Sequence, residues 1–123
     1  MTACRGLRGA TTVPENKADA ILEATAELLQ TLVERNDLQE ADVASVLFTA
    51  TPDLDAVYPA VAARKMGWTQ TALLCVQEMA VQGSLPRCIR VLIHWNTDRP
   101  QEQLHHVYLR EARTLRPDRV EEP

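Results

Sequence analysis

The residues of this 123-residue chain that could carry chemistry gather on one connection, residues 75–90. The connection holds the thiol of Cys75 and the carboxylate of Glu78, and it leads into a predicted strand that contains Arg90. A functional site is expected on such a segment, because a loop can aim side chains while the flanking strands hold it still. The alternative is a core cysteine beside a hydrated glutamate, which is the commoner situation for these residue types.

Arginine is the second residue type with a suggestive distribution. Four arginines lie close to predicted strand ends: Arg8, Arg64, Arg90 and Arg116. A guanidinium group binds a carboxylate through charge-assisted hydrogen bonds of roughly 1.5–3 kcal/mol each, so several of them suit a ligand with two carboxylates. The sequence has no nucleotide-binding, zinc-protease or serine-hydrolase signature. A metal site is not expected either, because adjacent His105 and His106 would point to opposite faces of a strand.

Composition restricts the class of protein. The length suits a single domain over residues 1–123, and 46% hydrophobic with 24% charged residues is an ordinary globular composition. A net charge of −4 argues against nucleic-acid binding, which requires a basic surface. No apolar run is long enough to span a membrane, and the N-terminus lacks a signal-peptide pattern. Three cysteines without metal-ligand spacing predict reduced thiols in a cytoplasmic protein.

The residue pattern predicts the elements that must position these side chains. Apolar and alternating segments predict five strands, at residues 3–8, 43–49, 73–75, 89–95 and 106–115. The last of these would also suit a helix. A broad apolar stripe predicts a helix of about five turns that is capped by Asn16 and ends at Asn36, and residues 56–66 predict a shorter one. The predicted fold class is α+β, a five-stranded mixed sheet packed on one long helix, with a mobile tail at 116–123.

One long helix can cover only one face of such a sheet. The strand at 43–49 is apolar on both faces, and the strand at 89–95 has a second face that mixes Arg90 with Leu92 and His94. A monomer would expose this surface, so self-association is expected. A pocket between subunits would then contain Arg90.

Five segments in order resemble one known family, the monofunctional AroH-type chorismate mutases. They are RGLRGATT (5–12), TATPDLDAVYPA (49–60), CVQEMAVQGSLPRCIRV (75–91), TDRPQEQLHHVYL (97–109) and LRPD (115–118). The resemblance is to the trimeric, Bacillus-type class of this family. It implies a homotrimer with a pseudo-α/β-barrel core and a site at each subunit interface. It implies the Claisen rearrangement of chorismate to prephenate, a step toward phenylalanine and tyrosine. That reaction is intramolecular, so no cofactor is expected.

The resemblance also implies roles for individual residues. Arg8 matches an arginine that binds a substrate carboxylate, and Arg90 matches one that faces the breaking ether oxygen. Glu78 matches the acceptor of a bond from the ring hydroxyl, with Cys75 beside it. Tyr108 matches a tyrosine that touches the side-chain carboxylate. The remaining substrate-binding positions are Tyr58, Arg64, Leu74, Leu115 and Arg116. Val61 departs from the family, in which a lysine is frequent near the site entrance.

Two other functions are compatible with a carboxylate-binding trimer. One is an imine deaminase of similar architecture, although Glu78 in its CVQEM context argues against it. The other is a non-catalytic module that binds dianions. Loss of chorismate absorbance would separate both from the leading hypothesis.

Overall fold

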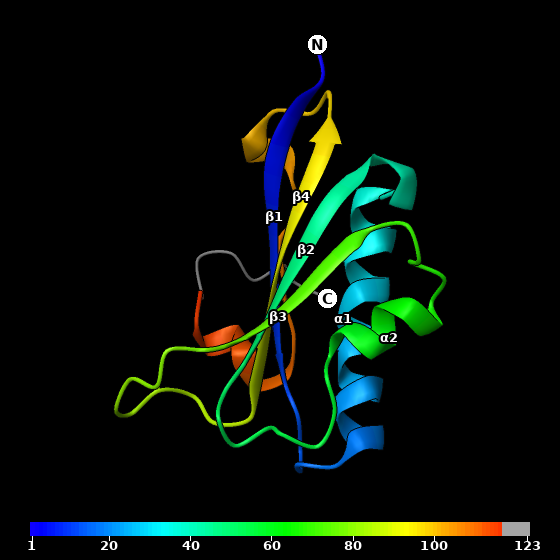
Figure 1. Cartoon of the computed structure of the whole chain (residues 1–123). Helices are drawn as coiled ribbons and strands as arrows, with labels where there is room; N and C mark the ends of the chain where they lie inside the picture. Colours follow the sequence, from blue (N-terminus) through cyan, green and yellow to red (C-terminus); the bar gives the residue numbers. More distant parts are fainter. Residues whose placement is uncertain (117–123) are drawn as a thin grey trace.

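The computed structural model describes residues 1–116 and has the expected α+β architecture (Figure 1). Its five-stranded sheet has the order β3-β2-β4-β1-β5. The strands are β1 (Ala3–Thr12), β2 (Val43–Ala50), β3 (Ala72–Gln77), β4 (Cys88–Thr97) and β5 (Val107–Tyr108). The β1–β4 and β2–β4 pairs are antiparallel, whereas β1–β5 and β2–β3 are parallel. The prediction of a mixed five-stranded sheet is therefore confirmed.

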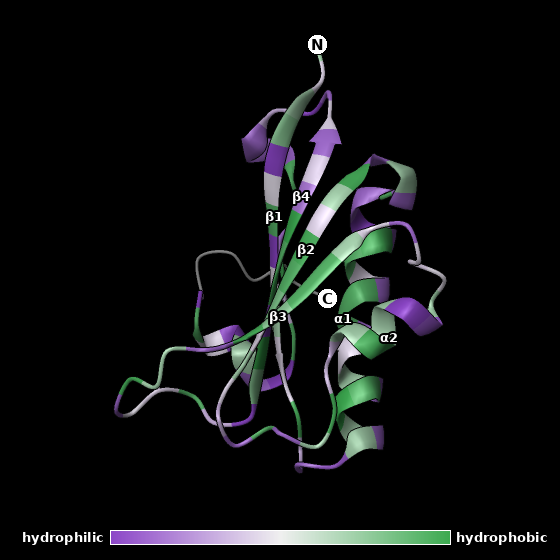
Figure 2. Ribbon diagram, in the orientation of Figure 1, coloured by the Kyte–Doolittle hydropathy of each residue, from purple (hydrophilic) through white to green (hydrophobic). Residues whose placement is uncertain are grey.

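Helices α1 (Ala18–Asn36) and α2 (Ala60–Lys65) lie on the same side of the sheet (Figure 1). The apolar stripe of α1 faces the strands (Figure 2), and Leu28 and Leu32 are fully buried against Phe48 and Ile93. Gly9 of β1 permits this close approach, because a Cβ there would come within 3.0 Å of the Leu32 side chain. The predicted long helix is thus confirmed, and its burial leaves only the opposite face of the sheet open. Within residues 1–116, no helix is long and apolar enough to cross a membrane.

The open face of the sheet is apolar over much of its area. Leu74 and Val76 on β3 are 60% and 41% exposed, and Leu47 and Leu92 beside them are half-buried. Within residues 1–116, one end of this face is covered, where Ala10 is packed against Tyr108, Ala112, Leu115 and Leu85. The open face therefore has the mixed apolar and charged character expected from the sequence.

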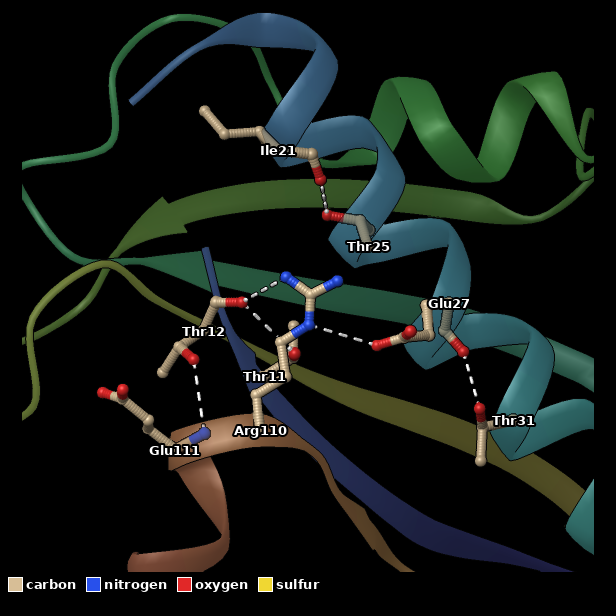
Figure 3. A network of polar contacts seen from close by, with 8 residues as sticks. All are labelled: Thr11, Thr12, Ile21, Thr25, Glu27, Thr31, Arg110 and Glu111. Carbon is tan, nitrogen blue, oxygen red and sulfur yellow. Dashed lines mark hydrogen bonds and ion pairs between the residues drawn. The ribbon is translucent and has the colours of Figure 1, made fainter. Parts of the chain in front are cut away.

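The fifth strand is much shorter than predicted. Of the predicted residues 106–115, only Val107–Tyr108 pairs with β1 as a strand, and after Leu109 the chain turns into the 3₁₀ helix η3 (Arg110–Thr114). Arg110 has a φ of 54°, a left-handed conformation that cannot continue a strand. Contacts to neighbouring elements accompany the turn: Arg110 Nε lies 3.3 Å from Glu27 Oε1, and Arg110 Nη1 donates to the Thr12 carbonyl (Figure 3).

Three further expectations need correction. β1 extends to Thr12 rather than ending at residue 8. β3 is an edge strand and exposes Leu74, so it is not the buried strand predicted at 73–75. Asn16 does not cap α1, because its side-chain amide donates to Asp55 at 2.7 Å and its oxygen accepts backbone N–H groups of residues 55 and 56. Of the predicted mobile tail, residues 117–123 lie outside the described part of the chain.

Candidate active site

A carboxylate, a guanidinium and a hydroxyl meet on the open face of the sheet. Arg90 Nε lies 3.3 Å from Glu78 Oε2, and the Thr49 hydroxyl donates to the same oxygen at 2.6 Å. Thr49 of β2 and Arg90 of β4 are directly paired, and Glu78 follows β3, where its backbone N–H donates to the Ala50 carbonyl at 2.9 Å. The side chain of Arg90 is 46% exposed and that of Glu78 is 23% exposed. The cluster is thus fixed by strand pairing, yet a ligand can reach it.

Arg8 lies on the same face as this cluster. It is paired with Leu92, and Arg90 is paired with Ala10, so the two arginines are diagonal neighbours across the β1–β4 pair. Diagonal neighbours of an antiparallel pair are about 7–8 Å apart, a separation that the carboxylates of one small dianion can bridge. The Arg8 backbone N–H donates to His106 Nδ1 at 3.0 Å, and both residues line a cavity of about 510 Å³.

The C-terminal part of the predicted site closes one end of this face. Tyr108 is opposite Ala10 in the β1–β5 pair and is buried. Leu115 is half-buried in the same cluster, and Arg116 after it is also half-buried. The structure therefore brings Tyr108 and Leu115 to the side of the sheet that holds Arg8, Arg90 and Glu78.

The other predicted residues form a separate group. Tyr58 and Cys75 line a cavity of about 610 Å³ between the loop that follows β2 and the end of β3. Cys75 is paired with Phe48 and packs on the helix-side core, so its side chain points away from the open face that bears Glu78. Arg64 on α2 belongs to this group, since its charge acts on the Cys75 thiol. Within one chain, Cys75 is therefore not the neighbour of Glu78 that was expected.

Leu74 belongs to neither group by direct contact. It lies on the open face of β3, opposite Leu47, and is largely exposed. Val61, the position that departs from the family, is half-buried on α2 next to the second group. The positions of these two residues leave their predicted roles untested.

The thiols of Cys75 and Cys88 both have a raised pKa. Burial raises the pKa of the Cys75 thiol, although a backbone hydrogen bond at Ala60 and the charge of Arg64 act in the opposite direction. Burial also raises the pKa of the Cys88 thiol, against the lowering effect of the Arg90 guanidinium. Thiols rather than thiolates are therefore present at neutral pH, and neither residue is suited to nucleophilic chemistry.

Three further residues of this region were not predicted from the sequence: Thr49, Cys88 and His106. Cys88 is buried two positions before Arg90 on the same face, and the Arg90 guanidinium lowers the pKa that burial of the thiol raises. Strand alternation could have identified Cys88, because residues i and i+2 share a face. Thr49 and His106 could not be found in this way, since their contacts depend on which strands are neighbours.

Comparison with known proteins gives consistent results. The model of the family "Chorismate mutase type I" matches residues 4–119. The chorismate mutase AroH of Thermus thermophilus is 53% identical over 115 residues, which are 93% of this chain and 94% of that protein. The chorismate mutase AroH of Bacillus subtilis (strain 168) is 48% identical over 115 residues, 93% of this chain and 91% of that protein. A solved chorismate mutase from Clostridium thermocellum matches with a TM-score of 0.87 and 52% identity, over 89% of this chain and 97% of that one.

These matches span nearly the whole chain and include both groups of predicted site residues. The agreement extends to the backbone, where almost all of the solved relative is covered. The chain belongs to the type I chorismate mutase family.

Proposed function

We propose that this chain converts chorismate to prephenate at sites shared between neighbouring copies of itself, as a step in the biosynthesis of aromatic amino acids. The observation that carries the proposal is the fixed Arg90–Glu78 pair on the open sheet face, with Arg8 as a diagonal neighbour. Membership of the family makes this reaction the first choice over the imine deaminase and the non-catalytic dianion binder. Free thiols at all three cysteines are in keeping with a cytoplasmic location.

The reaction needs orientation and charge rather than a nucleophile. One C–O bond of chorismate breaks while one C–C bond forms within the same molecule, and no proton changes place. The enzyme must hold the enolpyruvyl ether over the ring and stabilise negative charge on the ether oxygen. A preorganised cation can contribute several kcal/mol to that stabilisation, since each ~1.36 kcal/mol is tenfold in rate.

Arg90 is the residue assigned to the ether oxygen. Its Nε is engaged by Glu78, which fixes the guanidinium plane, and the planar group has further N–H donors for a ligand. Glu78 is held in turn by Thr49, so the cation is oriented before substrate arrives. Arg8 and Tyr108 are assigned to the substrate carboxylates, and Glu78 to the ring hydroxyl.

A homotrimer explains why one chain carries two separated groups of site residues. Arg8, Arg90 and Glu78 lie on the open face, whereas Tyr58 and Cys75 line the cavity beside the opposite face. A head-to-tail interface between copies joins two different surfaces, and a threefold rotation between copies closes it into a ring of three. The open face, with Leu74 and Val76 exposed, supplies the apolar area that such an interface requires.

Purified protein tests the proposal in two measurements. Chorismate absorbance is expected to fall on addition of enzyme with prephenate as product, and the mass in solution is expected to be three times 13.7 kDa. Binding of chorismate without turnover would favour the dianion-binding module instead. A stable monomer with full activity would contradict the shared sites.

A further inference from the structure

Side chains complete the edge of β1 that faces away from β4. The short strand β5 pairs only with Gly9 and Ala10 of this edge. Further along, the Gln101 side-chain amide donates to the Gly6 carbonyl at 2.7 Å and accepts the Gly6 N–H at 3.2 Å. Between these two regions, His106 Nδ1 accepts the backbone N–H of Arg8 at 3.0 Å. The imidazole thus occupies the place that a strand carbonyl would take in a longer β5.

We propose that His106, as the neutral imidazole protonated on Nε2, is a positioning residue that holds Arg8 for the substrate carboxylate. The proposal rests on the proposed function, because it deepens the role of Arg8 in that site. Nδ1 can accept a hydrogen bond only while it carries no proton, and in the imidazolium ion both nitrogens are donors. Protonation would therefore place two donors against each other and release the Arg8 backbone from its partner.

His106 is itself firmly held, so its position can be transmitted to Arg8. It is buried, and the next residue, Val107, is fully buried in the helix-side core. The side-chain amide of Asn36 at the end of α1 donates to the His105 carbonyl at 3.0 Å and accepts the His105 N–H at 2.9 Å. Rigid support of this kind is what keeps a site residue within a fraction of an ångström of its productive position.

Among residues 1–116, the charged side chains that share a cavity with the imidazole come from two elements. Arg8 of β1 and Glu102 of η2 (Gln101–Gln103) line the cavity that His106 also lines. β4 contributes Leu92 to this cavity, and the ionisable residues two positions to either side of it on the same face are Arg90, paired with Ala10, and His94, paired with Gly6. Within residues 1–116, none of the residues that line this cavity belongs to α1, which packs on the opposite face of the sheet. Histidine is the side chain whose charge changes between about pH 5 and 8, so the contact is sensitive to acid in a range where the protein can be assayed.

Three variants separate positioning from a general structural role. His106→Leu removes the acceptor, whereas His106→Asn keeps an acceptor oxygen near the place of Nδ1 but cannot titrate. His105→Asn is the matched control, because that side chain is exposed on the neighbouring position. Loss of one neutral hydrogen bond corresponds to about a fivefold to tenfold fall in kcat/KM for His106→Leu.

The expected pattern has three parts. His106→Asn recovers most of the kcat/KM lost in His106→Leu, and it lacks the decline of kcat/KM toward about pH 5 that wild type and His105→Asn share. His106→Leu adds little to the defect of Arg8→Ala, because the guanidinium that His106 positions is already absent in Arg8→Ala. Nitrogen-15 NMR of the wild-type imidazole at neutral pH finds Nδ1 without a proton.

Several results would overturn the proposal. They are a protonated Nδ1 at neutral pH, equal defects in His106→Leu and His106→Asn with both folded, or additive effects of the His106 and Arg8 substitutions. The NMR measurement does not depend on turnover, so an inactive wild type with Nδ1 unprotonated would count against the proposed function and leave the contact in place.

Discussion

Arg90 Nε and the Thr49 hydroxyl approach the same atom, Glu78 Oε2, from 3.3 Å and 2.6 Å. The two residues belong to β4 and β2 and are directly paired, while Glu78 arrives from the end of β3. Three strands therefore define the direction of one guanidinium group. A substitution at Thr49 should therefore change the orientation of the Arg90 guanidinium, even if Thr49 does not contact the substrate.

Thr49→Val tests this coupling, because valine keeps the shape and removes the hydroxyl. Loss of one hydrogen bond to a charged group predicts a fall in kcat/KM of about tenfold, or roughly 1.5 kcal/mol, with the fold intact. Ser45→Ala is the matched control, since Ser45 lies on the same strand and contacts His94 rather than Glu78. Steady-state kinetics compare the two variants. Equal kcat/KM for Thr49→Val and Ser45→Ala would argue against a role for Thr49 in orienting Arg90.

The Arg110 backbone makes a prediction about stability. Arg110 combines a left-handed φ of 54° with contacts to Glu27 and Thr12 (Figure 3). Arg110→Ala should lower the free energy of unfolding by about 1 kcal/mol, since it loses partly exposed contacts and keeps the unfavourable φ. Arg110→Gly loses the same contacts but fits the φ, so it should unfold closer to wild type. Urea unfolding at one protein concentration compares them, and equal destabilisation by both would show that backbone strain is unimportant.

The buried thiols predict a loss of stability at alkaline pH. Burial raises the pKa of Cys75 and of Cys88, so the unfolded chain releases these protons at about pH 8.5 while the folded chain retains them. The unfolded state then binds fewer protons, and stability falls as pH rises from there toward the folded pKa values. Cys75→Ala should make the free energy of unfolding fall less steeply with pH above about 8.5. Urea unfolding at a neutral and at an alkaline pH measures this slope. An unchanged slope would exclude a contribution from the Cys75 thiol.

Burial of the three cysteines predicts the order of thiol alkylation. Cys4 is exposed, Cys75 is partly exposed and Cys88 is buried. Iodoacetamide at neutral pH should therefore label Cys4 first and Cys88 last, since access to the thiol decreases in that order. Mass spectrometry of digests at increasing times measures the order, and early labelling of Cys88 would contradict its burial.

Shared sites predict that two inactive variants can restore each other. Arg90→Ala damages the group on the open face, and Cys75→Asp damages the group on the helix side. If each site takes one group from each of two copies, random mixed trimers contain about a quarter of intact sites. Chorismate turnover should reappear after the two variants are unfolded together and refolded. Refolding each variant alone is the control, and a mixture as inactive as its components would place both groups in one chain.

Much of the fold could be predicted from the sequence, because hydrophobic periodicity reports burial directly. The stripe from Ile21 to Leu32 gave the correct helix, and alternation from Ile89 to Trp95 gave the correct buried face of β4. Arg110 shows what periodicity does not report. Its positive φ ends the strand that was predicted at residues 106–115, and no sequence pattern marks an arginine that adopts such a φ. The predicted burial of β3 was also wrong, because the strand order of the sheet decides which strand lies at its edge.

The site was accessible to sequence reasoning only in part. Resemblance to the family identified Arg90 and Glu78, and the structure places their charged groups in contact. The separation of Cys75 from Glu78 follows from strand pairing, since Cys75 shares a face with its neighbour Phe48. The contact between His106 and Arg8 was invisible, because it joins residues 98 positions apart through a side chain that replaces a backbone carbonyl.

The central claim is that the oriented guanidinium of Arg90 stabilises charge on the ether oxygen of chorismate. Arg90→Lys tests it most directly, because lysine keeps the positive charge and loses the planar fork that Glu78 orients. The prediction is that wild type rearranges chorismate, and that Arg90→Lys loses kcat by at least about a hundredfold, far more than any change in KM explains. Near-normal kcat in a folded Arg90→Lys variant would contradict the role given to Arg90.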